Sequence, residues 1–207
     1  MSIRIPALRT LCLSFATLLA LAFINTAQAQ GLAEGGFDPA DLEAMTASVH
    51  QVDLTEDMVT RLIASFPEMR KTGAKFSKTQ LPEKPPVPGS GNSDLDALPD
   101  NKRAALEAVA QKHGFKTLEE WSDTAGTVVR GYIFLAQGKK PGATDTALRL
   151  NVEHTERNPN LTPEQKAEMI EMYRRIASSL KRLEPSDANY EMIVAMKDKL
   201  APIMDPQ

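Results

Sequence analysis

The stretch WSDTAGTVVRGYIFLAQ, residues 121–137, is the most apolar part of this 207-residue chain outside its N-terminus, and it carries one charge near its middle, Arg130. Its apolar side chains form a stripe at helical spacing and continue onto the other sides, which is typical of a helix buried nearly all round. Arg130 is the only charge in the 14 residues from 124 to 137. That length is too short for a membrane span, which takes about 20 residues. The stretch therefore predicts the central helix of an all-α domain.

Neighbouring residues predict where this helix begins and ends. Thr117 and Glu120 form a capping box, in which each side chain accepts a hydrogen bond from the other residue's backbone amide. Gly138 is typical of a residue just beyond a helix. A glycine inside a helix costs about 1 kcal/mol relative to alanine. Gly126 and Gly131 therefore suggest that another helix, or a ligand, comes close to the backbone there.

Apolar spacing and capping residues along the rest of the chain predict about seven helices, packed as an orthogonal or irregular bundle around residues 121–137, and no convincing strand pair. Residues 144–159 fit either a strand or a helix, and Asp145 as a cap favours the helix. Five prolines and two glycines within residues 77–99 predict an extended linker or strap. The expected organisation is a signal peptide (1–29), an N-terminal helical hairpin (30–76), the Pro/Gly-rich strap (77–99) and a five-helix domain (100–207).

Two details of the N-terminal hairpin are also predicted. The first helix begins near Pro39, and its apolar side chains are expected on one face: Leu42, Met45, Val49 and Val52. The second helix contains Pro67, which is expected to kink or end it, because proline has no backbone N–H and its ring clashes with the preceding turn.

The first 29 residues have the three parts of a secretory signal peptide. Arg4 and Arg9 form a basic region, an apolar run covers residues 11–24, and Ala-Gln-Ala at 27–29 matches a cleavage site. We expect cleavage before Gln30 and a protein secreted across the inner membrane. It would be periplasmic in a host with two membranes, and no transmembrane segment would remain after cleavage.

The composition argues against several classes of function. Removal of residues 1–29 would take away two of the 24 basic residues and none of the 27 acidic ones, so the net charge would fall by two units from −3. Without a clustered basic face, a nucleic-acid partner is not expected. The one cysteine, Cys12, lies in the signal peptide. The three histidines lack metal-ligand spacing, and no nucleophile or phosphate-binding motif occurs. We therefore predict no metal site, no cofactor and no enzymatic activity.

Arg130 is the sharpest candidate for a ligand contact. A guanidinium on an apolar helix must reach solvent or meet an acceptor, because an unpaired buried charge costs several kcal/mol. A structural ion pair, an exposed position and an anionic ligand are the three alternatives, with the first two favoured together. For a pocket on this helix, we expect Arg130 at its edge with Trp121 and Tyr132 near its wall.

Two further patterns supply alternative functions. Met169, Met172, Met192 and Met196 follow helical spacing on the last two long helices, and clustered thioethers can bind Cu(I), although methionine is more often a core filler. LTPEQ, residues 161–165, resembles the L-T-x-x-Q signature of small helical periplasmic stress proteins, the Spy and CpxP-like chaperones. The resemblance covers five residues and occurs once, and helix capping also accounts for it.

The expected function is thus a non-catalytic binding module of the cell envelope. Its partner would be an unknown envelope protein or a small anionic or amphipathic ligand. A periplasmic holdase-type chaperone, implied by the LTPEQ resemblance, and a methionine-based Cu(I) buffer are the alternatives. A holdase should expose a broad apolar surface, and a Cu(I) buffer should bring the four late methionines together.

Overall fold

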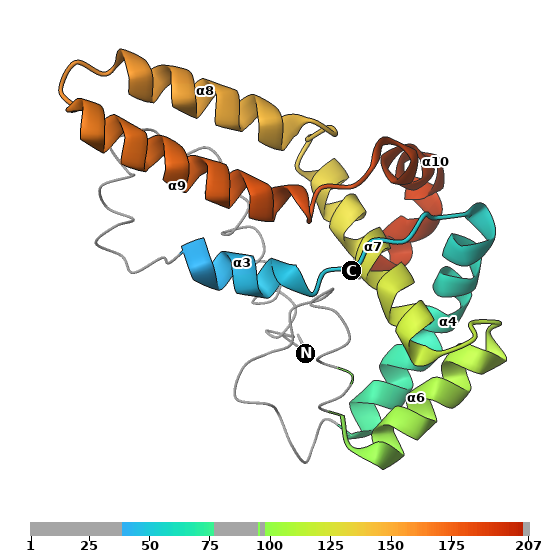
Figure 1. Cartoon of the computed structure of the whole chain (residues 1–207). Coiled ribbons are helices and arrows are strands. Elements are labelled where there is room, and N and C mark those ends of the chain that lie inside the picture. Colours follow the sequence, from blue (N-terminus) through green and yellow to red (C-terminus); the bar gives the residue numbers. More distant parts are fainter. Residues whose placement is uncertain (1–38, 77–94, 96–97, 205–207) are drawn as a thin grey trace, which may run out of the picture. The chain divides into compact units, whose positions relative to one another are not determined.

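A computed structural model describes residues 39–76, 95 and 98–204 of the chain (Figure 1). These residues contain seven α-helices and no strand, which confirms the all-α prediction. The predicted signal peptide and nearly all of the predicted strap lie outside the described residues. The helices are α3 (Pro39–Ala47), α4 (Glu56–Phe76), α6 (Asp100–Lys112), α7 (Leu118–Ala136), α8 (Ala143–Arg157), α9 (Pro163–Lys181) and α10 (Asp187–Met204).

The chain divides into two compact units, and the boundary between them falls within α3. Among the described residues, one unit, here called the hairpin unit, contains residues 39–43 and 142–181, and the other, here called the α7 unit, contains residues 44–76, 95, 98–141 and 182–204. These units do not follow the division expected at the Pro-rich strap. The reason is that α4, which precedes the strap, packs against α6, α7 and α10, which all follow it.

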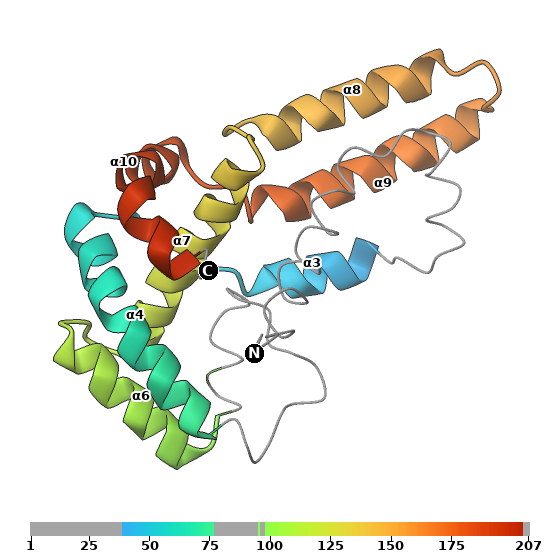
Figure 2. The same ribbon diagram turned by 180° about the vertical axis from the view of Figure 1, so that it is seen from behind.

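Helix α7 is the centre of its unit. It packs against α4, α6 and α10 (Figures 1 and 2), and every residue from Thr124 to Val128 is buried. Burial of five consecutive residues covers more than one full turn of helix, so α7 is enclosed on all sides over that turn. This agrees with the nearly all-round apolar character of its sequence.

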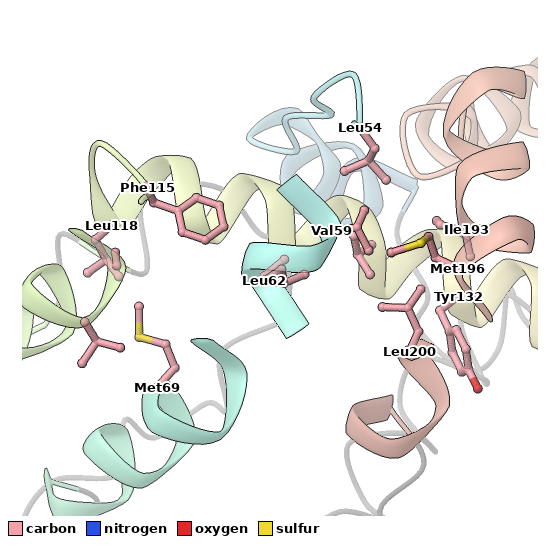
Figure 3. Close-up of a cluster of buried hydrophobic side chains, with 14 residues drawn as sticks. Leu54, Val59, Leu62, Met69, Phe115, Leu118, Tyr132, Ile193, Met196 and Leu200 are labelled. Carbon is pink, nitrogen blue, oxygen red and sulfur yellow. The ribbon is translucent and has the colours of Figure 1, made fainter. Parts of the chain in front are cut away.

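The core of the α7 unit is continuous along α4 (Figure 3). Met69, Phe115 and Leu118 lie towards one end of the cluster, and side chains from α10 lie towards the other. Leu95 and Leu98, from the end of the segment expected to be a strap, also pack against this core. The buried members are Leu54, Val59, Leu62, Met69, Val109, Ala110, Phe115, Leu118, Ala125, Val128, Tyr132, Ile193, Met196 and Leu200.

The predicted ends of α7 are present, with one change. The Thr117 hydroxyl accepts a hydrogen bond from the Glu120 amide at 3.1 Å. The Glu120 carboxylate accepts one from the amide of Lys116, at 2.6 Å, rather than from that of Thr117. Gly138 follows the helix with φ +68°, a left-handed conformation that glycine adopts without strain.

Gly131 confirms that a neighbouring helix approaches α7 closely. A Cβ atom at this position would lie 2.1 Å from Cδ1 of Ile193, a residue of α10. Helix α10 packs against α7, and the absence of a Cβ at residue 131 leaves the space that Ile193 of α10 occupies. The approaching group predicted at Gly131 is therefore another helix.

In the hairpin unit, α8 and α9 lie side by side (Figures 1 and 2). Residues 144–159, which were ambiguous between strand and helix, fall almost entirely within α8. The capping box of LTPEQ is present at the start of α9: the Gln165 side chain accepts from the Thr162 amide at 2.9 Å, and the Thr162 hydroxyl accepts from the Gln165 amide at 3.3 Å. Few apolar side chains are buried here, and the buried residues of the two helices are Thr155, Ala177, Ser179 and Leu180.

Three local expectations are wrong. Helix α3 ends at Ala47, so Val49 and Val52 are not on its face, and Met45 is 41% exposed. Helix α4 does not end at Pro67, one of the two alternatives predicted for this proline, but continues to Phe76; after the proline, Met69 is buried in the core and Glu68 bonds to Lys112 of α6. Helix α8 has Gly142, with φ +86°, at its N-cap position, and Asp145 instead lies in its first turn.

Candidate functional site

Arg130 is buried, with 4% of its surface exposed. Its guanidinium donates a hydrogen bond to the backbone carbonyl of His50 at 2.7 Å and a long one to the Thr127 hydroxyl at 3.4 Å. The carboxylate of Asp123 acts on it electrostatically. A buried guanidinium needs an acceptor, and the backbone carbonyl of His50 is one that Arg130 uses.

Trp121 and Tyr132 do not lie with Arg130. Nine residues separate Trp121 from Arg130, which is about half a rotation of an α-helix, and Tyr132 is likewise about 200° from Arg130. The Trp121 indole donates to the Ser65 hydroxyl at 2.8 Å, and its ring centroid is 6.3 Å from that of Phe66. Tyr132 is buried in the apolar core. The three residues predicted around one pocket thus occupy opposite sides of α7.

Arg130 instead belongs to a group of side chains that holds residues 50–54, the non-helical segment just before α4. The burial of this segment alternates: Gln51 and Asp53 are exposed, Val52 is partly buried and Leu54 is buried. Alternation with a period of two is typical of an extended chain that lies along a surface. Both Val52 and Leu54 pack in the core of the α7 unit.

Asn189 of α10 makes the most specific contacts with this segment. Its side-chain amide donates to the carbonyl of Val52 at 2.9 Å and accepts from the amide of Leu54 at 2.8 Å. An asparagine side chain offers one acceptor oxygen and one NH₂ donor, so it can pair with two backbone groups of an extended chain at once. Asn189 is 2% exposed, and these two bonds satisfy both ends of a buried amide.

Thr127 completes the group from α7. Its hydroxyl accepts from the amide of Val52 at 3.2 Å and donates to the carbonyl of Asp123 at 2.8 Å. We call Thr127, Arg130 and Asn189 the main-chain clamp, because their hydrogen bonds with residues 50–54 end on backbone atoms of that segment.

The exposed Gln51 side chain attaches the same segment to the residues before α10. Its amide nitrogen donates to the carbonyl of Arg182 at 2.8 Å and to that of Glu184 at 2.7 Å. These bonds are at the surface, where water competes with them, so they contribute less than the buried bonds of the clamp.

Charge is concentrated beside the clamp. Burial lowers the pKa of the Arg130 guanidinium to about 10, and the nearby Asp123 acts in the opposite direction. Burial also raises the pKa of the Asp123 carboxyl, against the electrostatic effects of His50 and Arg130, which lower it. Arg130 therefore remains a cation at neutral pH, in an environment where a charge is costly.

Sequence reasoning identified Arg130 but missed Thr127 and Asn189. The signal for Asn189 is weak: it lies four residues before Ile193, so a polar residue occupies the buried face of an otherwise apolar helix. Thr127 has the same kind of signal within the apolar stretch of α7. Neither pattern indicates which distant segment such a side chain would bind.

The methionines named for the Cu(I) alternative belong to two different units of the described residues. Met169 and Met172 belong to the hairpin unit, whereas Met192 and Met196 pack in or against the core of the α7 unit. Within residues 39–76, 95 and 98–204, no three histidine, cysteine or acidic side chains are grouped as metal ligands. The large apolar side chains exposed in this part of the chain are on three different helices: Met45 (41%), Leu150 (53%) and Val194 (42%).

The chain matches no protein-family model, and it has no significant match among curated proteins or solved structures. None of the helices in the described residues has the length and apolar character needed to cross a bilayer. The case for a function therefore rests on the geometry of the main-chain clamp and on the sequence.

Proposed function

We propose that this protein is a non-catalytic binding module of the cell envelope whose partner is a polypeptide. The observation that carries the proposal is the main-chain clamp, in which three side chains from two helices bind the backbone of an extended segment. Backbone contacts of this kind supply affinity for an extended chain, and apolar contacts at alternate side chains supply selectivity.

Burying the polar and charged side chains of the clamp costs desolvation free energy, so stability alone does not explain them well. A buried ionic group can often be replaced by packed apolar side chains with no loss of stability, or with a gain of about 1–4 kcal/mol. Arg130 and Asn189 are both polar side chains at buried positions of their helices, 4% and 2% exposed. Departures from the rules of core packing are expected at functional sites, which favours a role in recognition over one in stability alone.

A polypeptide is favoured over a small anion as the partner. The Arg130 guanidinium already donates to a neutral backbone carbonyl, and the carboxylate of Asp123 is close enough to act on it. An anion would have to compete with both groups, and it would meet the negative charge of Asp123. The envelope location in this proposal rests on the signal-peptide pattern of residues 1–29.

The proposal is tested on protein purified from cells after any processing of the chain has taken place. The mass of this protein also shows whether residues 1–29 have been removed. A photo-reactive amino acid at Asp53, an exposed position of the clamped segment, is expected to give a discrete adduct with an envelope protein in intact cells. The same group at Gln111, exposed on α6, is the matched control and is expected to give none. The captured protein is then purified and its affinity measured directly.

Thermal unfolding with anionic metabolites, vesicles of envelope lipids or Cu(I) completes the test. None of these is expected to raise Tm, whereas a ligand at 100 times its Kd would add about 2.7 kcal/mol. A Tm rise with one of the anions that Arg130→Ala abolishes would refute the polypeptide proposal in favour of an anion site.

A further inference from the structure

We propose that the main-chain clamp is an exchangeable peptide site. Residues 50–54 are its resident occupant, and an extended segment of another protein with apolar side chains two positions apart can replace them. This inference rests on the proposed function and names the chemistry of the partner.

The first support is that recognition depends on backbone atoms. The hydrogen bonds from Arg130, Thr127 and Asn189 end on the His50 carbonyl, on the Val52 amide and carbonyl, and on the Leu54 amide. Every non-proline residue offers these groups, so the clamp does not require the sequence of the resident segment.

Selection comes from two positions only. Val52 and Leu54 pack in the core, whereas Gln51 and Asp53 between and beside them are exposed. A competing segment therefore needs an aliphatic residue at two positions separated by one, in an extended conformation that keeps both on the same side. The residues at the exposed positions are unrestricted by these contacts. Proline is excluded at the two aliphatic positions, because it cannot supply the amides that the clamp binds.

The resident segment can leave without unravelling a helix. Helix α4 has its own N-terminal cap, because the Thr55 hydroxyl accepts from the Met58 amide at 3.2 Å. Helix α3 ends at Ala47, before the segment begins. Residues 50–54 are thus attached through side-chain contacts and their own apolar packing, which is the kind of region that opens locally while the rest of a fold persists.

Attachment to the chain favours the resident segment. A tethered occupant competes at an effective concentration in the millimolar range. A free peptide should therefore bind the unmodified protein weakly and bind a variant with a weakened resident more strongly. Leu54→Ala is such a variant, because it shortens the deeper of the two apolar anchors while leaving the backbone groups in place.

The experiment titrates the whole protein with a peptide of residues 48–55, SVHQVDLT, with blocked ends. The expected result is a saturable rise of Tm in Leu54→Ala, with an apparent affinity about tenfold or more above that of the unmodified protein. The same peptide with serine in place of Val52 and Leu54 is the matched control and should not change Tm. The response should also be lost in the double variant Leu54→Ala, Asn189→Ala.

Amide hydrogen exchange of the unmodified protein keeps the proposal falsifiable if those variants do not fold. The amides of Val52 and Leu54 are expected to exchange at least tenfold faster than those of Val128 and Ile193, which lie in the centres of α7 and α10. Equal rates would show that the segment opens only on global unfolding, and the proposal would be overturned. The same holds if Leu54→Ala folds and the peptide does not raise its Tm.

These results are separable from those for the proposed function. If the protein cross-links to an envelope partner whose affinity is unchanged by Leu54→Ala and Asn189→Ala, the exchangeable site is wrong and the binding module stands. If the peptide binds as expected but no partner is captured in cells, the site stands and the envelope function fails.

Discussion

Gly131→Ala tests how closely α7 and α10 approach each other. The new methyl group would lie 2.1 Å from Cδ1 of Ile193, whereas ordinary carbon contacts are about 3.5–4.0 Å. Alanine gains about 1 kcal/mol over glycine in a helix interior. Over-packing a core costs about 1–3 kcal/mol. Because Ile193 is fully buried and has little room to move, we expect the variant to be about 1 kcal/mol less stable, as measured by urea unfolding followed by circular dichroism.

The second half of this prediction isolates the cause. Ile193→Val removes Cδ1 and should cost about 0.5–1.5 kcal/mol by itself. Without Cδ1, the nearest atoms to the new methyl group are Cγ1 of residue 193 at 3.5 Å and Cβ of Pro185 at 3.8 Å, both ordinary contacts. Gly131→Ala should therefore stabilise the Ile193→Val protein by up to about 1 kcal/mol. The double-mutant cycle should give a coupling of about 2 kcal/mol.

Gly73→Ala in α4 is the matched control. No atom lies within 4 Å of a Cβ placed there, so only the helix propensity of alanine should act, and stability should rise by up to about 1 kcal/mol. The close approach of the two helices is refuted if Gly131→Ala is as stable as the parent protein, or if its effect is the same with isoleucine and with valine at position 193.

Asn189→Ala should destabilise the protein by about 2–4 kcal/mol in urea unfolding, because two backbone groups lose their partner at a buried site; a loss below about 0.5 kcal/mol would contradict the clamp. The pKa of Asp123 is raised in the folded protein, so stability should fall as pH rises from its unfolded pKa through its folded pKa, and Asp123→Asn should flatten this part of the pH profile. The pKa of Glu68 is lowered, first by its hydrogen bond to Lys112 and then by that to His113. The stability that Glu68 contributes should be present above its unfolded pKa and lost as pH falls through its folded pKa. Glu68→Gln should therefore reduce stability at neutral pH and weaken the acid dependence, and an unchanged acid limb would show that these contacts do not act in solution.

The predictions that succeeded depend on local chemistry. The capping boxes at Thr117 and Thr162 require only residues three positions apart, and both hydroxyls accept the expected amide. The steric role of Gly131 was also accessible, because glycine weakens a helix interior and is therefore favoured there mainly where a neighbouring group needs the space. Burial of α7 followed from the apolar surface around its whole circumference.

The predictions that failed concern residues whose conformation is set from far along the chain. Val49 and Val52 fit the helical period of the preceding residues, yet Val52 and Leu54 fit an extended period equally well. The extended conformation is stabilised by Thr127 and Asn189, which lie 75 and 135 residues from the amides they bind. Arg130 was identified as the residue in need of an acceptor, but a backbone carbonyl carries no sequence signature. The sequence analysis placed Arg130, Trp121 and Tyr132 in one site because they are close in sequence. The helical geometry of α7 puts Arg130 on the opposite side from the other two.

The discontinuity of the α7 unit has a consequence for biosynthesis. Residues 142–181 interrupt this unit, and its core needs Ile193, Met196 and Leu200 from α10. A nascent chain released from the ribosome only as far as α9 has α4, α6 and α7 but not the helix that covers them. Such a chain exposes the apolar faces meant for α10 and cannot close its core until synthesis has passed residue 200. The α7 unit therefore completes its core only after α10 has been synthesised, and until then α4, α6 and α7 lack the helix that covers them.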